Sequence, residues 1–313
     1  MQAVILAAGL GTRLRPVTES RSKAMVPVLG RPLVERAMMP FVENGVREFV
    51  LVVSPDDDQI RAHFDQTTLD LSVQFVVQNE RLGMAHALGT AVPLVRGRFA
   101  LSSCDSLIDT SHVRELLAAV IGADAALSLL DVEPQLISRS AVVELDGNRV
   151  RRIVEKPSLE TAPSHTVSLP HYVFSPKLLD HLSRVEPSPR GEYELQDAIQ
   201  GLIDDGGNII GVRTAERHQV STPEDLLELT RRLFPDRRQA ADIERALSGE
   251  GTTLIEPLSI EPEVVIGADC EIGPEVFLEN GCRVGDGAVV RRSIVLRGGR
   301  VADGETVEDR VVT

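Results

Sequence analysis

The chain has 313 residues, more than one hydrophobic core usually organises, so we expect two domains. Hydrophobic residues make up 42% and charged residues 26%, the composition of an ordinary soluble globular protein. The formal net charge of −14 argues against a nucleic-acid or anionic-membrane partner, because both require a basic face. So acidic a protein must gather its few cations locally to bind phosphates, which gives weight to lysines and arginines beside glycines.

The sequence carries no signal for export or for metal-bound or bridged cysteines. No apolar stretch is long enough to span a bilayer, and no basic region or cleavage site precedes the first strand, so we expect a cytoplasmic protein. Cys104, Cys270 and Cys282 have no CxxC or Cys/His spacing. Structural zinc and a disulfide framework are therefore both disfavoured.

Strand-like apolar runs alternate with amphipathic helical stretches up to about residue 232. The predicted elements are, in chain order, a strand at 3–8, a helix at 33–45, strands at 47–55 and 73–78, a helix at 84–95 and a strand at 98–106. This alternation predicts an α/β fold with a Rossmann-like, doubly wound and mostly parallel sheet. Ligands of such sheets bind at the carboxyl ends of the strands, where the glycine-rich loop after residue 8 and the polar turn SSCDS fall.

A six-residue period begins after a charged stretch at 236–248, which reads as a connecting helix closed by Gly249 and Gly251. The first row of the period is Leu254, Ile260, Ile266, Ile272, Leu278, Val284, Val290 and Leu296, and the second is Leu258, Val264, Cys270, Val276, Cys282, Ala288 and Ile294. A sustained hexad period predicts a β-helix, in which each hexad forms one face of a three-sided coil. Cys270 and Cys282 belong to the second row, so we expect them to pack inside the coil. The register decays after Gly298, where we expect a terminal cap.

These patterns divide the chain into three parts. We expect an α/β domain at 1–232, a linker helix at 233–252 and the coil at 253–313.

A glycine-rich loop, LAAGLGTRLRP, directly follows the first predicted strand. Ala8, Gly9 and Gly11 have little or no side chain, so the backbone can approach a nucleotide and present N–H groups to phosphate oxygens. Such a loop can also be only a tight connection between a strand and a helix. Arg13 and Lys23 favour phosphate binding, because an arginine grips two phosphate oxygens at once and a lysine supplies a compact charge.

With these residues in place, the segment resembles the GxGTRLxP…K…PV signature of the sugar-1-phosphate nucleotidylyltransferases, such as the glucose-1-phosphate thymidylyl- and uridylyltransferases. The resemblance covers most of residues 1–230, and the hexad region resembles the left-handed β-helix of the family's longer members. It implies transfer of NMP from an NTP to a sugar 1-phosphate with Mg²⁺, Arg13 stabilising the leaving pyrophosphate and Lys23 contacting the phosphates. The nucleotide-binding positions that it implies in the loop are Leu6, Ala8, Gly9, Gly11 and Thr12.

Two further segments resemble the family's base and metal sites. Gln78 and Gly83 match the pair that contacts the base, and a glutamine amide offers both a donor and an acceptor to a pyrimidine edge. Asp105 matches a ligand of Mg²⁺, for which a hard carboxylate is suited. Without the resemblance, Gln78 would be a surface residue at a strand end and Asp105 a turn residue.

The later motifs resemble the family's sugar site. Glu155 and Lys156, in VEKP, match the pair that holds a sugar hydroxyl and the sugar phosphate. Glu192, in RGEYELQDAI, serves either the sugar site or the start of a helix. The segment TPEDLL resembles the motif that opens the helix after the second metal ligand, and its Thr222 and Asp225 also suit a helix N-cap.

Four positions depart from the family pattern. Gln219 stands at the place of the second metal carboxylate and brings an amide oxygen without a charge. Cys104 replaces the glycine before the metal aspartate, while Ala141 and Pro170 replace glycines against which the sugar lies. We expect a reshaped sugar-phosphate pocket, whose acceptor is glucose 1-phosphate or a modified sugar or cyclitol phosphate.

Two classes of function follow from these residues. The first is an active nucleotidylyltransferase, with dTTP or UTP favoured by the glutamine. The second is a catalytically impaired nucleotide-sugar-binding paralogue that acts as a regulatory subunit. Arg13, Lys23, Asp105 and Lys156 together favour the enzyme, because a binding module has no need of a cation for the leaving group.

The coil has two possible roles. An acyltransferase activity is disfavoured, because residues 219–313 contain no histidine to serve as a general base. We expect an assembly or lid domain that favours a homo-oligomer.

Overall fold

The computed structural model describes residues 1–234 and 247–313. The chain forms two compact units, one of Met1–Gly9 with Val34–His218 and the other of Leu10–Leu33 with Gln219–Thr313. The segment that carries Arg13 and Lys23 therefore belongs to the same unit as the C-terminal coil. The ranges expected from the sequence, 1–232, 233–252 and 253–313, remain a prediction.

The first unit is built on a nine-stranded sheet. In spatial order its strands are β5 (Ser72–Val77), β4 (Glu48–Val53), β1 (Gln2–Leu6), β6 (Phe99–Ser103), β11 (Thr166–Phe174), β8 (Ala125–Asp131), β12 (Ile209–Arg213), β10 (Arg149–Glu155) and β9 (Ala141–Asp146). The short strands β7 (Ser106–Leu107) and β13 (His218–Gln219) lie outside it.

The sheet is mixed, which corrects the expectation of a mostly parallel sheet. Strands β5, β4, β1 and β6 are parallel, as the alternation of strands and helices predicts. β11 is antiparallel to both β6 and β8, while β9 and β10 form an antiparallel hairpin. A strand that is buried along nearly all of its length, such as β11, has the same sequence pattern in either direction, so periodicity could not reveal this reversal.

Helices cover this sheet along its buried strands. They are α1 (Leu33–Glu43), α2 (Asp58–Asp65), α3 (Met84–Ala91), α4 (Thr110–Ala119), α5 (Lys177–Leu182) and α6 (Leu195–Asp204), with 3₁₀ turns η4 (Val92–Leu94) and η5 (Pro134–Arg139). Alternate residues of β1, β4 and β6 pack with α3, α5 and α6 in one core cluster, whereas the intervening strand residues are buried outside that cluster. Both faces of the sheet are therefore covered, as a doubly wound fold requires.

The second unit contains the segment 10–33, a helix and the coil. The segment forms three 3₁₀ turns, η1 (Thr12–Leu14), η2 (Val17–Glu19) and η3 (Lys23–Met25), followed by the pair β2 (Pro27–Val28) and β3 (Arg31–Pro32). Helix α7 (Pro223–Leu233) contacts β2. Thr222 and Asp225 form a capping box at its start, so the predicted N-cap is confirmed.

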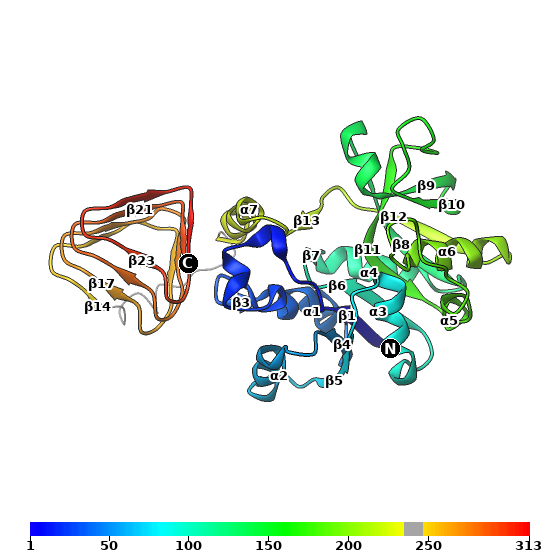
Figure 1. Ribbon diagram of the computed structural model, residues 1–313, viewed down its shortest axis with the longest axis horizontal. Helices are drawn as coiled ribbons and strands as arrows, with labels where there is room; N and C mark the ends of the chain where they lie inside the picture. The colour runs from blue at the N-terminus through cyan, green and yellow to red at the C-terminus, as the bar shows by residue number, and fades with distance from the viewer. Residues whose placement is uncertain (235–246) are drawn as a thin grey trace. The chain divides into compact units, whose positions relative to one another are not determined.

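The coil consists of three parallel four-stranded sheets, and Figure 1 shows its three-sided outline. The first is β14 (Leu247–Ser248), β17 (Val265–Ile266), β20 (Arg283–Val284) and β23 (Arg300–Val301); the second is β15 (Thr253–Leu254), β18 (Glu271–Ile272), β21 (Val289–Arg291) and β24 (Thr306–Glu308); the third is β16 (Leu258–Ile260), β19 (Val276–Leu278), β22 (Ile294–Val295) and β25 (Val311–Val312). Both predicted apolar rows pack inside it up to Val290, all of them buried except the partly buried Leu254, and both cysteines belong to this core as expected.

The register of the coil changes where the predicted rows end. Val265 pairs with Arg283, 18 positions on, whereas Arg283 pairs with Arg300, 17 positions on. One residue is thus missing from the later turn, and Val295 takes the inward place expected for Leu296. The terminal cap expected after Gly298 is wrong, because β23, β24 and β25 continue the coil to Val312.

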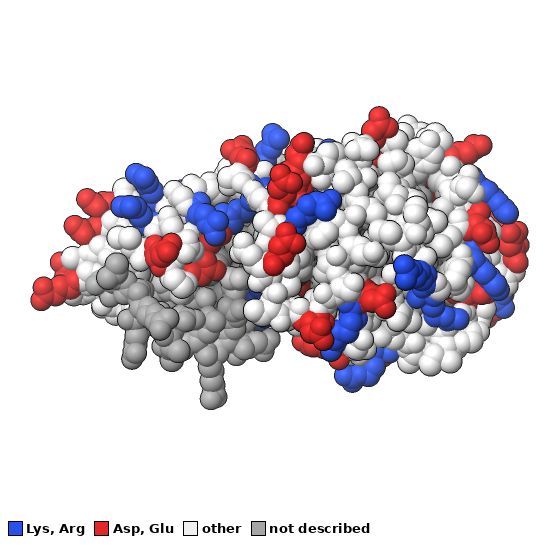
Figure 2. Space-filling model, turned by 90° about the horizontal axis from the view of Figure 1, so that it is seen from below, with Lys and Arg blue, Asp and Glu red and all other residues white. Residues whose placement is uncertain are grey.

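Two further expectations concern the linker helix and membrane-spanning segments. The connecting helix at 236–248 lies outside the described residues, except that 247–248 form β14. No helix in the described ranges is both long and apolar enough to cross a bilayer. Figure 2 shows acidic and basic side chains interspersed over the face drawn there.

Candidate active site

Four neighbouring strands of the first unit end at the same edge of the sheet, and three predicted site residues lie there. The amide of Ala7 donates to the carbonyl of Val52 at 2.8 Å, and that of Gln78 to Val53 at 2.9 Å. The amide of Cys104 donates to Leu6 at 3.0 Å. Ala8, Gln78 and Asp105 therefore follow β1, β5 and β6 at their carboxyl ends, where doubly wound sheets bind their ligands.

The start of the glycine-rich loop is held by two side chains that the motif does not include. Arg81 Nε donates to the carbonyl oxygen of Ala8 at 2.8 Å, and Ser54 Oγ donates to the same oxygen at 3.2 Å. Arg81 Nη2 also donates to Ser54 Oγ, at 3.1 Å. These bonds fix the peptide from which the loop departs. The signal for Ser54 in the sequence is its place directly after β4, but nothing marks Arg81.

The side-chain amide of Gln78 is oriented by the protein. Its Nε2 donates to Nδ1 of His86 at 3.1 Å and to the carbonyl oxygen of Gly83 at 3.4 Å. Gln78 itself is buried, at 4% exposure. Because an amide nitrogen only donates, this arrangement makes Nδ1 of His86 an acceptor and turns Oε1 of Gln78 away from both partners.

Gly83 precedes α3 in a conformation that requires glycine. Its φ is 103°, and a Cβ placed there would lie 2.5 Å from the carbonyl oxygen and 2.9 Å from the amide nitrogen of Tyr193. The backbone of Tyr193 also bonds to both sides of this position, because it donates to Leu82 O at 2.7 Å and accepts from Ala85 N at 3.0 Å. The glycine thus lets the segment that contains Glu192 pack against the start of α3.

Asp105 lies beside a buried polar cluster. Ser103 Oγ donates to Asp105 Oδ1. The ring of His171, on β11, lies between the hydroxyls of Ser102 and Ser106, 2.9 Å from each. Burial lowers the pKa of His171 to about 3, so this imidazole is neutral at physiological pH. The cluster fixes the backbone on either side of Asp105, and its histidine could not be found from sequence spacing.

The segment 10–33 of the second unit brings Gly11 and Lys23 together. Gly11 has a φ of 64°, and a Cβ there would lie 3.0 Å from Cβ of Lys23 and 3.0 Å from Cγ2 of Thr18. Thr18 Oγ1 donates to the carbonyl oxygen of Gly11 at 2.8 Å. Lys23 is buried, at 7% exposure, while Thr12 and Arg13 begin η1 with Arg13 exposed. The glycine is needed so that the turn can close on the lysine stem.

Glu155 and Lys156 lie at the end of β10. Lys156 Nζ is 3.1 Å from Glu155 Oε1 and 3.9 Å from Glu192 Oε2, so the three predicted sugar-site residues lie together. Lys156 has a φ of 47° and donates its amide to Ser140 O at 3.0 Å. Burial raises the pKa of Glu155, and the charge of Lys156 opposes that rise.

A cavity of about 730 Å³ opens beside Glu155. It is bounded by β10, α5, α6 and the segment 184–190, and its lining includes Arg190, Glu194 and Asp197. Arg190 Nη2 donates to Glu194 Oε1 at 2.7 Å. Desolvation raises the pKa of Asp197, and the charge of Glu194 raises it further.

The positions that depart from the family pattern differ in their surroundings. Ala141 pairs with Glu155 and Ser168 on the neighbouring strands, and its methyl group packs in the main core cluster at 4% exposure. It therefore fills core space and does not line the cavity. Pro170 lies within the stretch where the β11–β8 register shifts, and it is half-buried. Gln219 ends β13.

Within the described ranges, no three His, Cys, Asp or Glu side chains are arranged to hold a metal ion. Mg²⁺ in phosphoryl-transfer sites is commonly bound by one or two carboxylates together with substrate phosphates and waters, a ligand set that does not require three such side chains.

Family models match both parts of the chain. The "Nucleotidyl transferase" model matches residues 2–233, which include the strand ends and the motifs described above, and the "GMPPB C-terminal domain" model matches residues 254–313. The chain belongs to the nucleotidyl transferase family and, within it, to the sugar-1-phosphate nucleotidylyltransferases.

Curated relatives agree with this membership. The chain is 35% identical over 250 residues to the UTP–glucose-1-phosphate uridylyltransferase AglF of Haloferax volcanii, which covers 77% of this chain and 100% of that protein. It is 30% identical over 334 residues to a glucose-1-phosphate thymidylyltransferase of Streptomyces griseus, covering 100% of this chain and 92% of the relative. It is 31% identical to the bifunctional protein GlmU of Methanococcus maripaludis and spans 60% of that protein's length.

Solved structures share the fold. A UDP-glucose pyrophosphorylase complexed with UDP-glucose has a TM-score of 0.68 at 21% identity, covering 75% of this chain and 99% of that one. The UTP-bound enzyme of Acinetobacter baumannii has a TM-score of 0.66 at 25% identity, covering 76% and 94%. This nucleotidyltransferase thus has the mixed α/β, Rossmann-like fold of that group.

Within each unit of the nucleotidyltransferase, predicted site residues lie together. Gln78 with Gly83, and Glu155 with Lys156 and Glu192, form two groups in the first unit. The supporting residues that the motifs missed, Arg81 and His171 among them, act through partners far along the chain.

Proposed function

We propose that the protein transfers the nucleotidyl group of dTTP or UTP to a sugar 1-phosphate, giving an NDP-sugar and pyrophosphate. The observation that carries this proposal is that Ala8, Gln78 and Asp105 follow three strands that end at the same edge of the sheet, with the amide of Gln78 held in one orientation. The names of the relatives from Haloferax and Streptomyces support the same pair of nucleotides, since one is a uridylyl- and the other a thymidylyltransferase.

The preference for uracil or thymine follows from the hydrogen bonds of Gln78. Its amide nitrogen is engaged by Gly83 and His86, so the group left for the base is the acceptor Oε1. Uracil and thymine carry a donor N–H at N3, whereas cytosine carries an acceptor there. A carbonyl oxygen facing that position therefore accepts a hydrogen bond from the first two bases and repels the third.

The chemistry we propose is an in-line displacement. A phosphate oxygen of the acceptor attacks the α-phosphorus of the NTP, the bond to the β-phosphate breaks, and pyrophosphate leaves. Arg13 and Lys23 neutralise the charge on the departing phosphates, and Lys156 holds the acceptor's phosphate. The backbone amides of the loop at Gly9, Gly11 and Thr12 orient the triphosphate. Catalysis then consists of positioning and charge stabilisation.

We propose Mg²⁺ as the cofactor, with Asp105 as its carboxylate ligand and Gln219 at the place of the family's second ligand. A single carboxylate at a strand end fits this ion, because Mg²⁺ keeps several waters and binds substrate phosphates. When bound, it supplies positive charge that stabilises the reacting phosphates. Ser103, which donates to Asp105, orients the carboxylate for this role.

The acceptor we propose is glucose 1-phosphate or a modified sugar or cyclitol phosphate. Glu155 would bind a sugar hydroxyl and Glu192 would orient Lys156, which lies 3.1 Å from the first and 3.9 Å from the second. Pro170 in place of a glycine reshapes this half of the site. The coil, we further propose, is left-handed and assembles the chain into a homo-oligomer, as in the family's longer members.

Release of pyrophosphate tests this function. The intact protein would be assayed with each of dTTP, UTP, CTP, ATP and GTP against a panel of sugar and cyclitol 1-phosphates, with and without Mg²⁺. We expect Mg²⁺-dependent turnover with dTTP or UTP. Tight NTP binding without turnover for any pair would contradict the proposal and favour the regulatory paralogue.

A single substitution tests the base selection. In His86→Leu the acceptor for the Gln78 amide nitrogen is removed, so the amide can rotate and present its nitrogen to cytosine. We expect the ratio of kcat/KM for UTP over CTP to fall about fivefold, the effect of one hydrogen bond of ~1 kcal/mol. His165→Leu, at an exposed position before β11, is the matched control and should leave the ratio unchanged. An unaltered ratio in His86→Leu would exclude this role for Gln78.

A further inference from the structure

The segment 10–33 has little regular structure of its own to hold Arg13 and Lys23 in place. It contains three 3₁₀ turns of three residues each and one two-stranded pair. Such turns leave many backbone groups without the repeating bonds of a helix. A segment of this kind keeps one geometry only where other parts of the fold fix it.

A buried ion pair joins this segment to the coil. Arg21 Nη1 is 2.6 Å from Glu279 Oε1, and the two side chains are only 11% and 5% exposed. The other carboxylate oxygen, Oε2, accepts a hydrogen bond from the backbone amide of Arg297 at 2.7 Å. Glu279 is thus fixed by the coil with one oxygen and holds Arg21 with the other. Breaking such a pair is costly, because the remaining charge stays buried without its partner.

The coil is buried on the side where this ion pair lies. Glu279 directly follows β19, and the outward residues of β16, β19 and β22 in the same sheet are Ser259, Phe277 and Ile294. All three are buried, although they lie outside the cluster inside the coil. On another face, Val265 is 39% exposed and Arg283 is exposed. The third sheet is therefore the covered face of the coil.

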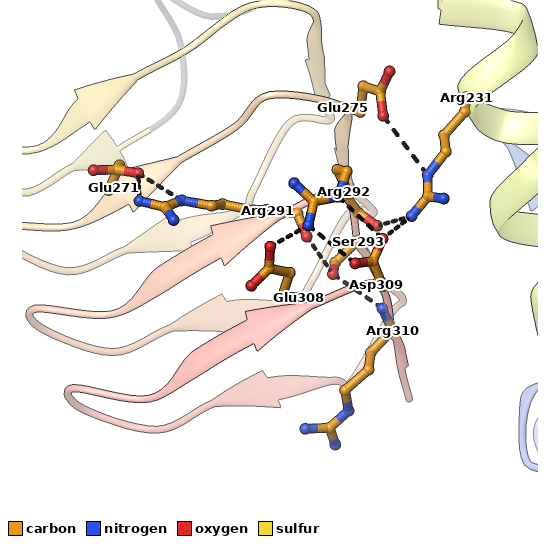
Figure 3. Close-up of polar contacts among 9 residues, drawn as sticks. All are labelled: Arg231, Glu271, Glu275, Arg291, Arg292, Ser293, Glu308, Asp309 and Arg310. Carbon is orange, nitrogen blue, oxygen red and sulfur yellow. Dashed lines mark hydrogen bonds and ion pairs between the residues drawn. The ribbon is translucent and has the colours of Figure 1, made fainter.

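A second set of contacts joins the coil to α7, and Figure 3 shows how they converge on Arg231. Its Nη2 donates to the carbonyl oxygen of Arg292 at 3.0 Å and pairs with Asp309, while its Nε is 3.7 Å from Glu275 Oε2. Arg292 pairs with Asp309 as well, at 3.0 Å. Helix α7 is in contact with β2, which closes the segment 10–33 at its far end. The coil therefore holds the segment directly through Arg21 and indirectly through α7.

We propose that Arg21 and Glu279 are positioning residues of the nucleotide site, through which the coil fixes the segment that carries Arg13 and Lys23. The coil then supports the nucleotide site by holding the segment 10–33 in place. This role rests on the function proposed above, since it assigns the segment to NTP binding. Arg21 lies two residues before Lys23, so a displaced Arg21 displaces the lysine whose side chain closes against Gly11.

Glu279→Gln in the full chain tests the proposal. The amide keeps an acceptor for Arg297 but removes the charge that holds Arg21. We expect KM for the NTP to rise about tenfold, with KM for the acceptor unchanged, because a displacement of about 1 Å in a binding group has effects of this size or greater. Arg21→Lys keeps the positive charge and should restore part of the affinity relative to Arg21→Met.

A matched control lies in the same coil. Glu271→Gln also neutralises a glutamate that pairs with an arginine, Arg291 at 2.5 Å, but this pair is partly exposed and lies on β18 and β21, away from the segment. It should leave KM for the NTP unchanged. Equal changes in the two variants would overturn the proposal, because they would report a general effect of charge on the coil.

Hydrogen exchange separates this inference from the proposed function. If Glu279 fixes the segment, amides within residues 11–28 should exchange about tenfold faster in Glu279→Gln than in the unaltered protein, whether or not the protein turns over any substrate. Unchanged exchange there, even with a less stable coil, would overturn the positioning role. Faster exchange in a protein that shows no turnover would support the anchor and reject only the function.

Discussion

At the scale of single residues, the buried histidine of the first unit illustrates how polar groups support the candidate site. His171 accepts from or donates to Ser102 and Ser106 with its two ring nitrogens, and these serines flank Asp105 in sequence. Both ring nitrogens have partners, so the neutral ring satisfies its surroundings, whereas a second proton would bring a charge into a buried site. The ring therefore fixes the strand end without contributing charge to it.

The titration of His171 predicts how stability depends on pH. Its pKa is 6.5 in the unfolded chain and about 3 when folded, so the unfolded state binds more protons between these values. The contribution of His171 to the free energy of unfolding is therefore fully present above pH 6.5 and is lost as the pH falls towards 3. At pH 5.5 the loss should be ~1.4 kcal/mol.

The His171→Gln variant isolates that contribution. Urea denaturation at pH 7.5 and 5.5, with divalent metals chelated, should show a free energy of unfolding that falls less in the variant than in the unaltered protein. Part of the fall should persist, because burial also lowers the pKa of His112. Equal falls in both proteins would mean that His171 binds its proton equally well in the folded state.

Which of these residues the sequence could predict depends on how local their signals are. Ala8, Gln78 and Asp105 each follow an apolar strand, and parallel strands bring such positions together, so their placement was predictable. His171 is 69 positions from Ser102 and Glu279 is 258 positions from Arg21, and no periodicity connects either pair. Supporting contacts of this kind require the fold itself.

At the scale of elements, the junction between α3 and the segment around Tyr193 depends on one glycine. Gly83→Ala would place a methyl group 2.5 Å from the carbonyl oxygen of Tyr193 at a φ of 103°. We expect a loss of ~3 kcal/mol in the free energy of unfolding, from backbone strain together with overpacking. Gly97→Ala is the control, since Gly97 also has a positive φ, of 65°, but nothing lies within 4 Å of its Cβ position.

The control should cost only ~1 kcal/mol, the strain of a left-handed residue with a side chain. Chemical denaturation of both variants measures the difference. Equal losses would show that the backbone at Tyr193 moves aside, and would remove close packing as the reason for glycine at this position.

The coil shows where element prediction from a repeat fails. The hexad rows correctly placed inward residues up to Val290, because a regular period fixes which side chains face the interior. Beyond it, Ile294, Val295 and Leu296 are three apolar residues in succession, and the period alone continues to the last of them. In the structure Val295 faces the interior, because the turn there is one residue shorter and Arg292 adopts a φ of 45°.

At the scale of the whole molecule, the grouping of residues 10–33 with the coil divides the glycine-rich loop between the two units. Its start, at Ala8, is held by Ser54 and Arg81 in the first unit, and its continuation from Leu10 belongs to the second. The chain order of motifs predicts one continuous loop and gives no reason to expect such a division. Each unit has its own core, formed by the sheet in one and by the coil in the other.

Separate cores predict additive effects on stability. Leu127 in the sheet and Ile272 in the coil are both fully buried but belong to different clusters, so Leu127→Ala and Ile272→Ala should each cost about 2–5 kcal/mol. Their combination should equal the sum to within about 0.5 kcal/mol, because the two residues belong to different core clusters. Ile272→Ala with Val290→Ala provides the contrast, since these two residues are paired on β18 and β21 and share one cavity. Urea denaturation of the single and double variants measures both sums. We expect the coil pair to depart from additivity by more than about 0.5 kcal/mol, and coupling of the same size between Leu127 and Ile272 would show that the two cores interact energetically.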